Sequence, residues 1–292
     1  MKIDIARQPL VPAFMTLFAL AVAAMCAGIP VSDTSGAVRD ALPLLGGQLA
    51  RFQAAYPVWS KFAAGFMLLF TGMCAGRITI RYNLYTVGTC LPIPLYAIVA
   101  CGIATGGNYL AGFAASMLLA LATKNYCRAF CNGYGFDAIF RASLYLGLMP
   151  LVYAPGLPML LPLPLAVLLF RRTLREVAVA TAGLLLPVFT ACYVSWGTGA
   201  EFTAPLIKLG QSAIEGMPLH LFLDIPLPAL VMAGGIVLLD LTALFFFLAD
   251  IYAAGTKPRF ILFYNIGILI LTLAVLCSPA ATPEAVSYTH LR

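Results

Sequence analysis

The stretch ASLYLGLMPLVYAPGLPMLLPLPLAVLLF, residues 142–170, decides the fold class of this chain. It contains no charged side chain, and an arginine flanks it on each side, Arg141 before it and Arg171 after it. About twenty apolar residues cross a bilayer core once, and two full crossings need about forty. A single crossing would place one arginine flank outside the cell. We therefore expect two shortened helices joined at residues 153–158, which together form a proline-rich hairpin.

The composition of the whole chain agrees with a membrane location. Of 292 residues, 17 are Lys or Arg and 11 are Asp or Glu, so 10% are charged, while 62% are hydrophobic. The mean hydropathy is +0.96. A soluble domain carries about a quarter charged residues, because its surface must face water. The composition excludes a soluble enzyme, a disordered linker and a nucleic-acid-binding domain, and it predicts membrane lipids as partners.

The rest of the chain predicts further helical spans separated by polar stretches. A polar stretch at 31–60, with a surface helix over 38–56, and a second at 197–226 predict external amphipathic loops. We predict an all-α polytopic membrane protein with about nine or ten membrane segments, folded as a single transmembrane domain over residues 1–286. Besides the hairpin, the expected spans are 11–30, 62–76, 84–104, 110–123, 176–196, 227–248 and 260–278.

The distribution of cations predicts the orientation, because short translocated loops are poor in Lys and Arg. With the N-terminus in the cytoplasm, four cations are external: Arg39, Arg51, Lys61 and Lys208. Both long polar loops then face outward. The cytoplasmic set is Lys2, Arg7, Arg77, Arg81, Lys124, Arg128, Arg141, Arg171, Arg172, Arg175, Lys257 and Arg259.

The last six residues, 287–292, look like a translated sequencing adapter. We treat this segment as a non-native tail, which leaves His290 without meaning. On this interpretation the gene is truncated, and a tenth span is missing after Pro279.

The cysteines predict neither a disulfide framework nor a metal centre. Six of the 8 cysteines lie in apolar stretches or at their ends, as small hydrophobic residues do. Cys127 and Cys131 are four residues apart in a basic connection, but no histidine or second cysteine pair accompanies them. No cofactor or metal is therefore expected.

Three acidic positions are candidate functional residues. Asp240 lies near the middle of the span 227–248, where a charged carboxylate is costly and a functional role is the default hypothesis, with proton or ion coupling as the candidate function. A protonated carboxyl that hydrogen-bonds a neighbouring helix is the structural alternative. Asp33 and Asp40 lie just beyond the first span, where a carboxylate can act as a general base toward an acceptor hydroxyl. Their alternative is an ordinary solvated turn.

Other polar residues form smaller groups. His220 and Asp224 have helical spacing and, together with Glu201 and Glu215, form a candidate external site for a divalent ion or a substrate, although a soluble surface explains them as well. Arg171, Arg172 and Arg175 can hold a lipid phosphate, or serve only as topology determinants. Asp137 and Arg141 are four residues apart, which predicts an ion pair on a helix.

Several stretches resemble an uncharacterised family of bacterial multi-pass inner-membrane proteins, a domain of unknown function. They are RYNLY at 81–85, LPIPLY at 91–96, FDAIFRASLYLGLMPLVY at 136–153 and LLLPVF at 184–189. The likeness covers most of the chain up to the last expected span. It implies a location in the bacterial inner (cytoplasmic) membrane and carries no established activity.

LGLMP at 146–150 and the acidic first external loop more distantly resemble polytopic glycosyltransferases that use polyprenyl-phosphate sugars. In that group an acidic residue early in this loop is the catalytic base. The likeness implies Asp33, then Asp40, in that role, with a polyprenyl-phosphate-linked sugar as the substrate. This chain lacks a paired acidic motif and an external acceptor domain.

Three functional hypotheses follow from the sequence. The first is transfer of an extracytoplasmic envelope glycan or lipid-linked precursor, with Asp33 as the base. The second is a transporter or flippase, in which Asp240 lines the path. The third is a non-enzymatic scaffold subunit, which would bind protein partners of the cell envelope. Replacement of Asp33 should abolish the first activity, and replacement of Asp240 the second.

Overall fold

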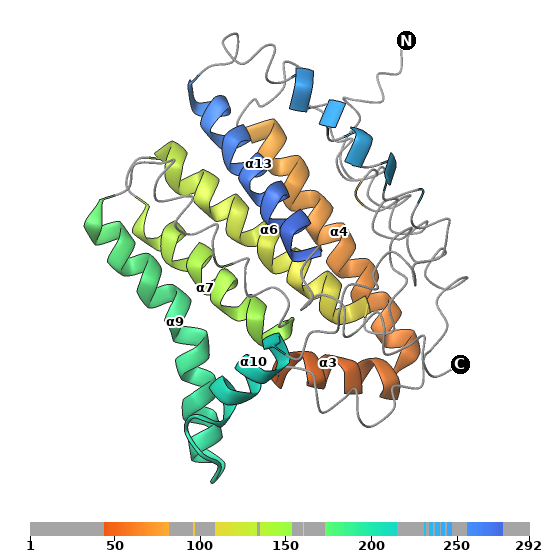
Figure 1. The fold of residues 1–292 in the computed structure, drawn as a ribbon, viewed down its shortest axis with the longest axis vertical. Coiled ribbons are helices and arrows are strands. Elements are labelled where there is room, and N and C mark those ends of the chain that lie inside the picture. The colour runs from red at the N-terminus through yellow and green to blue at the C-terminus, as the bar shows by residue number, and fades with distance from the viewer. Residues whose placement is uncertain are drawn as a thin grey trace.

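The computed structural model describes residues 44–81, 96, 109–132, 135–153, 160, 173–214 and 256–276, with short stretches between 231 and 246. These residues are helical and contain no β-strand, so the all-α prediction is confirmed for this part of the chain. The expected span 11–30 lies outside it, 84–104 lies outside it except for residue 96, and about half of 227–248 lies outside it. The helices are α3 (Leu44–Ala55), α4 (Pro57–Arg81), α6 (Tyr109–Asn132), α7 (Phe136–Val152), α9 (Leu174–Gly197), α10 (Ala204–Ile214) and α13 (Thr256–Leu276) (Figure 1).

Helices α4 and α6 run in the same direction. Near their starts Ala64 and Leu110 share one buried cluster, and near their ends Ile78 and Cys127 share another. Helix α7 runs the opposite way. Val152 at its end packs with Ala111 at the start of α6.

Helices α9 and α13 share the direction of α7. The start of α7 packs with the start of α9 through Ala138 and Ala180, and Phe260 at the start of α13 contacts Phe130 at the end of α6. The connections 82–108, 154–172 and 215–255 therefore each join opposite ends of the bundle.

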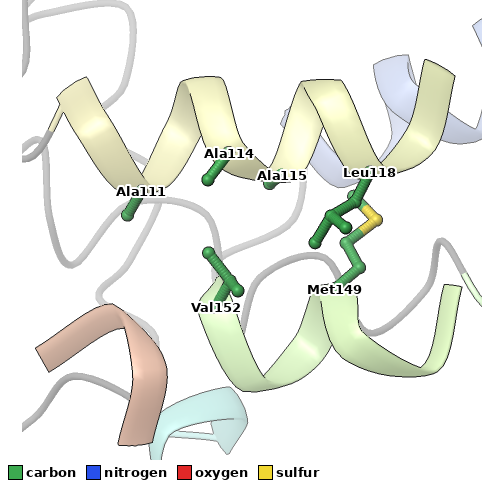
Figure 2. Close-up of a cluster of buried hydrophobic side chains, with 6 residues drawn as sticks. All are labelled: Ala111, Ala114, Ala115, Leu118, Met149 and Val152. Atoms are coloured by element: carbon green, nitrogen blue, oxygen red, sulfur yellow. The ribbon is translucent and has the colours of Figure 1, made fainter. Parts of the chain in front are cut away.

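Small side chains allow the helices to pack closely. Three alanines of α6, namely Ala111, Ala114 and Ala115, face Met149 and Val152 of α7 in one buried cluster (Figure 2). Short side chains bring two helix backbones near each other and leave room for a long side chain opposite them. The alanine spacing of three and four residues places them on one face of α6.

Two glycines bring α7 and α9 into backbone contact. A Cβ atom on Gly183 would lie 2.8 Å from the carbonyl oxygen of Phe140, and a Cβ atom on Gly147 would overlap the carbonyl of Leu184. No side chain larger than hydrogen fits at either position without moving the helices apart. The two glycines therefore fix the distance between α7 and α9.

Two helices extend beyond the expected spans. Helix α4 covers 57–81 rather than 62–76 and begins at Pro57, within the stretch expected as external loop. Proline suits the first helical position, because that residue has no need of its N–H. Helix α6 continues past Thr123 through Lys124 and Arg128, which we expected in a connection. The apolar run ends there, but these residues remain good helix formers.

Helix α7 ends where the hairpin was expected to turn. Tyr153 is extended (φ −141°, ψ 100°) and its N–H donates to the carbonyl of Met149. Pro155 follows two residues later, and a proline disfavours helical backbone in the residue before it. The expected break at 153 is confirmed, while residues 154–159 lie outside the described part of the chain.

Two of the described helices, Pro57–Ile78 and Leu174–Gly197, are long and apolar enough to cross a membrane. Helix α9 buries only a narrow stripe, and Leu185, Phe189 and Tyr193 are exposed on its other faces. Contiguous exposed apolar side chains are unusual in a monomeric soluble protein. This surface favours a nonaqueous environment.

The contact between α7 and α9 predicts the effect of Gly147→Ala. The added methyl group overlaps the backbone of Leu184, so we expect a loss of about 1–3 kcal/mol in unfolding free energy. The matched control is Gly112→Ala on α6, where a Cβ atom meets nothing within 4 Å. The control should leave the protein equal or up to about 1 kcal/mol more stable. Unfolding followed by circular dichroism in detergent micelles measures the stability of both variants. Equal losses of stability would contradict the close contact between α7 and α9.

Candidate functional site

The residues predicted as functional sites fall into two groups. Those within the described residues are Asp137, Arg141 and Arg175, and all three lie at one end of the bundle, at the starts of α7 and α9. The others lie outside the described residues: Asp33, Asp40, Arg171, Arg172, His220, Asp224 and Asp240.

Asp137 and Arg141 form the expected ion pair on the first turns of α7. The Arg141 Nε donates to Asp137 Oδ1 at 2.9 Å, and both side chains are exposed. Asp137 also lies in the first helical turn, where a negative charge complements the helix dipole. Exposed pairs of this kind contribute roughly 0–1 kcal/mol, so the pair supports α7 rather than a reaction.

The start of α9 is fixed by a capping box around exposed Arg175. The Thr173 backbone N–H donates to Glu176 Oε2 at 3.0 Å, and the Thr173 hydroxyl donates to the same oxygen at 3.2 Å. Glu176 is buried. The pattern of threonine followed three residues later by glutamate is readable in the sequence, although we did not identify it there.

The described cations gather where five helices converge, which we call the basic end. Ile78, Cys127 and Ile261 share a buried cluster that joins the ends of α4 and α6 to the start of α13. A second cluster joins the end of α6 to the starts of α7 and α9. Helices α4, α6 and α13 contain no Asp or Glu. The cations at this end are Arg77, Arg81, Lys124, Arg128, Arg141, Arg175, Lys257 and Arg259.

Both tryptophans lie at the opposite end, which we call the tryptophan end. Trp59 is 68% exposed at the start of α4, and Trp196 is 61% exposed at the end of α9. Helices α3 and α10 also lie at this end (Figure 1). They and the first turn of α4 carry the other described cations, Arg51, Lys61 and Lys208.

The tryptophans and arginines stand at matching separations on the two helices. On α4, Trp59 and Arg77 are 18 residues apart, and on α9, Arg175 and Trp196 are 21 apart. At 1.5 Å per residue these separations are about 27 and 32 Å. Among the described residues the buried polar side chains between them are mostly hydroxyls, and the charged Lys61 and Glu176 lie within two residues of Trp59 and Arg175.

Buried hydroxyl pairs connect the helices inside this layer. Tyr126 of α6 and Ser143 of α7 hydrogen-bond at 2.9 Å, and Tyr264 of α13 lies edge-on to Tyr126. Nearer the tryptophan end, Ser60 of α4 and the hydroxyl of Tyr109 are 2.6 Å apart. Sequence reasoning missed these pairs, because their partners are distant in sequence and neutral. They position helices and offer no group for acid–base chemistry.

The described residues contain no group of three or more His, Cys, Asp or Glu side chains able to hold a metal ion. Cys127 is buried in an apolar cluster with Ile78 and Ile261. The feature of the described structure that favours a ligand is therefore the basic end, whose cations attract anionic groups.

Comparison of the chain with models of known protein families, with curated proteins and with solved structures finds no match.

The Tyr126–Ser143 pair predicts a measurable coupling between α6 and α7. Tyr126→Phe and Ser143→Ala should each cost about 0.5–2 kcal/mol, because each leaves a buried partner without its hydrogen bond. The double variant should cost less than the sum of the two single variants by roughly 0.5–1 kcal/mol. Urea unfolding in micelles tests this, with exposed Thr190→Ala as a neutral control. If the cost of the double variant equals the sum of the two single costs, the Tyr126–Ser143 hydrogen bond is contradicted.

Proposed function

We propose that this chain is a polytopic protein of the bacterial inner membrane, with its basic end in the cytoplasm, and that it acts on lipid-linked envelope precursors at the outer face. The observation that carries the membrane assignment is the separation of about 27 and 32 Å between arginine and tryptophan on α4 and α9. A bilayer hydrocarbon core is about 30 Å thick.

The chemistry of the two ends supports the orientation. Arginine and lysine are retained on the cytoplasmic side of inner-membrane proteins, and tryptophan concentrates at the boundary between hydrocarbon and headgroups. Eight described cations lie at the basic end and three at the tryptophan end, by the two sets named above. The basic end then faces the anionic phosphates of the inner leaflet, and each cation contributes about 1 kcal/mol of attraction to them.

The helix directions support more than two crossings. The connections 82–108, 154–172 and 215–255 each join opposite ends of the bundle. This agrees with a span at 84–104, a second hairpin segment before Arg171 and a span at 227–248, as the apolar pattern predicts.

The proposed activity is transfer from a polyprenyl-phosphate-linked sugar, with Asp33 as general base and Asp40 as the second candidate. Asp40 precedes the first residue of α3 by four positions, and α3 lies at the tryptophan end. A carboxylate before α3 would then work at the outer face, where lipid-linked sugars are consumed. There it can remove a proton from the acceptor hydroxyl as that oxygen bonds to the anomeric carbon of the sugar, while the bond from that carbon to the phosphate oxygen breaks and polyprenyl phosphate leaves.

The orientation predicts the behaviour of reporter fusions. Alkaline phosphatase, which is active only outside the cytoplasm, should be active when fused after Gly199 and inactive when fused after Gly133. A fluorescent protein that matures only in the cytoplasm should give the reverse pattern. Gly133 lies between α6 and α7 and Gly199 in the turn after α9. The reverse pattern at both sites would overturn the orientation.

The activity predicts that loss of Asp33 blocks envelope glycan transfer. A deletion strain of a source-related bacterium should accumulate a polyprenyl-linked sugar, seen by lipid mass spectrometry. The intact gene and the Thr190→Ala variant, which changes an exposed side chain of α9, should restore the profile. Asp33→Ala should not restore it. An unchanged profile in the deletion strain would refute transfer, and a defect confined to Asp240→Asn would favour transport instead.

A further inference from the structure

Helix α10 presents three different faces. Pro205 is buried and Leu209 half-buried, and α10 packs against α9. At about 100° per residue, Leu206 and Ile207 point roughly 100° and 200° away from Pro205. They are 45% and 52% exposed. Lys208 lies about 300° around the helix, so the exposed apolar side chains and the exposed cation occupy separate faces.

The start of α10 lies deeper in the bundle than the end of α9. The ring of Phe202, two residues before α10, meets the ring of Phe189 edge-on at 5.9 Å. Phe189 is seven residues before Trp196, which is about 10 Å along the helix. The chain therefore turns after α9 and comes back toward the apolar layer before α10 begins. Figure 1 shows α10 crossing from α9 toward α3.

We propose that α10 is an in-plane helix seated in the leaflet at the tryptophan end, with Leu206 and Ile207 among the lipid acyl chains and Lys208 directed to the headgroups. The proposal rests on the membrane assignment above. Amphipathic helices at a membrane surface bury their apolar face about 5–10 Å below the headgroups, which matches the depth set by Phe189.

Continuity with the outer surface of α9 identifies lipid as the occupant. Leu185 and Phe189 are exposed along α9, and Phe202, 40% exposed, meets the Phe189 ring. The exposed Leu206 and Ile207 follow four and five residues later. A surface that is continuous with the side of a membrane span meets the same acyl chains. Lysine suits the edge of such a surface, because its long stem reaches the headgroup level while its methylene groups stay in apolar surroundings.

Tryptophan fluorescence of the full chain in vesicles tests the proposal. Trp59→Phe with Trp196→Phe gives a background without tryptophan. Single tryptophans then enter at Ile207→Trp, at the matched Lys208→Trp, and at Phe66→Trp on the exposed face of α4. The vesicles contain phosphatidylcholine with or without bromine atoms on the acyl chains. Circular dichroism shows that each variant keeps its helical content.

The proposal predicts that tryptophan at 207 is quenched at least twofold more by bromolipid than tryptophan at 208, which iodide in the buffer quenches instead. Equal quenching at 207 and 208, with Phe66→Trp quenched by bromolipid, would overturn the placement of α10 and leave the membrane assignment intact. If bromolipid quenches none of the three tryptophans, the placement of α10 and the membrane assignment are both wrong.

Discussion

In the bilayer that we propose, the apolar layer between the arginines and the tryptophans imposes one constraint on the chain: inside it, every backbone N–H and C=O must find a partner within the protein. Helices satisfy this requirement internally, and the described segments between the arginines and the tryptophans are helical. Their free ends must lie at its two boundaries. Arginine and tryptophan are each most stable at the boundary that suits their side chain. The arginines lie at one boundary of the layer, and Trp59 and Trp196 lie at the other.

Inside the proposed bilayer the helices cannot rely on exclusion of water to hold them together, because lipid is as apolar as leucine. Close packing and neutral hydrogen bonds take its place. Gly147 and Gly183 let the backbones of α7 and α9 touch, and the alanines of α6 receive the long side chains of α7. The Tyr126–Ser143 bond then fixes the rotation of α6 against α7 without a charge in the apolar layer.

The sequence predicts what depends on composition along one segment. Four features could be predicted, because each follows from local apolar or charged patterns. They are the all-helical character, the gathering of the described cations, the Asp137–Arg141 pair and the break at Tyr153. The end of α6 could not, since loss of apolar character at Lys124 does not end a helix. The Ser60–Tyr109 pair depends on how two helices are rotated against each other, which hydropathy does not encode. The candidate carboxylates Asp33, Asp40 and Asp240 lie outside the described residues, so their role remains a prediction from the sequence.

The central claim is that Trp59 and Trp196 mark one boundary of a bilayer-thick apolar layer. It is tested most directly by the fluorescence of the unmodified protein in vesicles with bromine atoms at different depths along the acyl chains. The account predicts blue-shifted emission, with both tryptophans quenched most strongly by the bromines nearest the headgroups. Trp59→Phe and Trp196→Phe should each lower the intensity and leave this depth unchanged. Red-shifted emission that aqueous iodide quenches and bromolipid does not would contradict it.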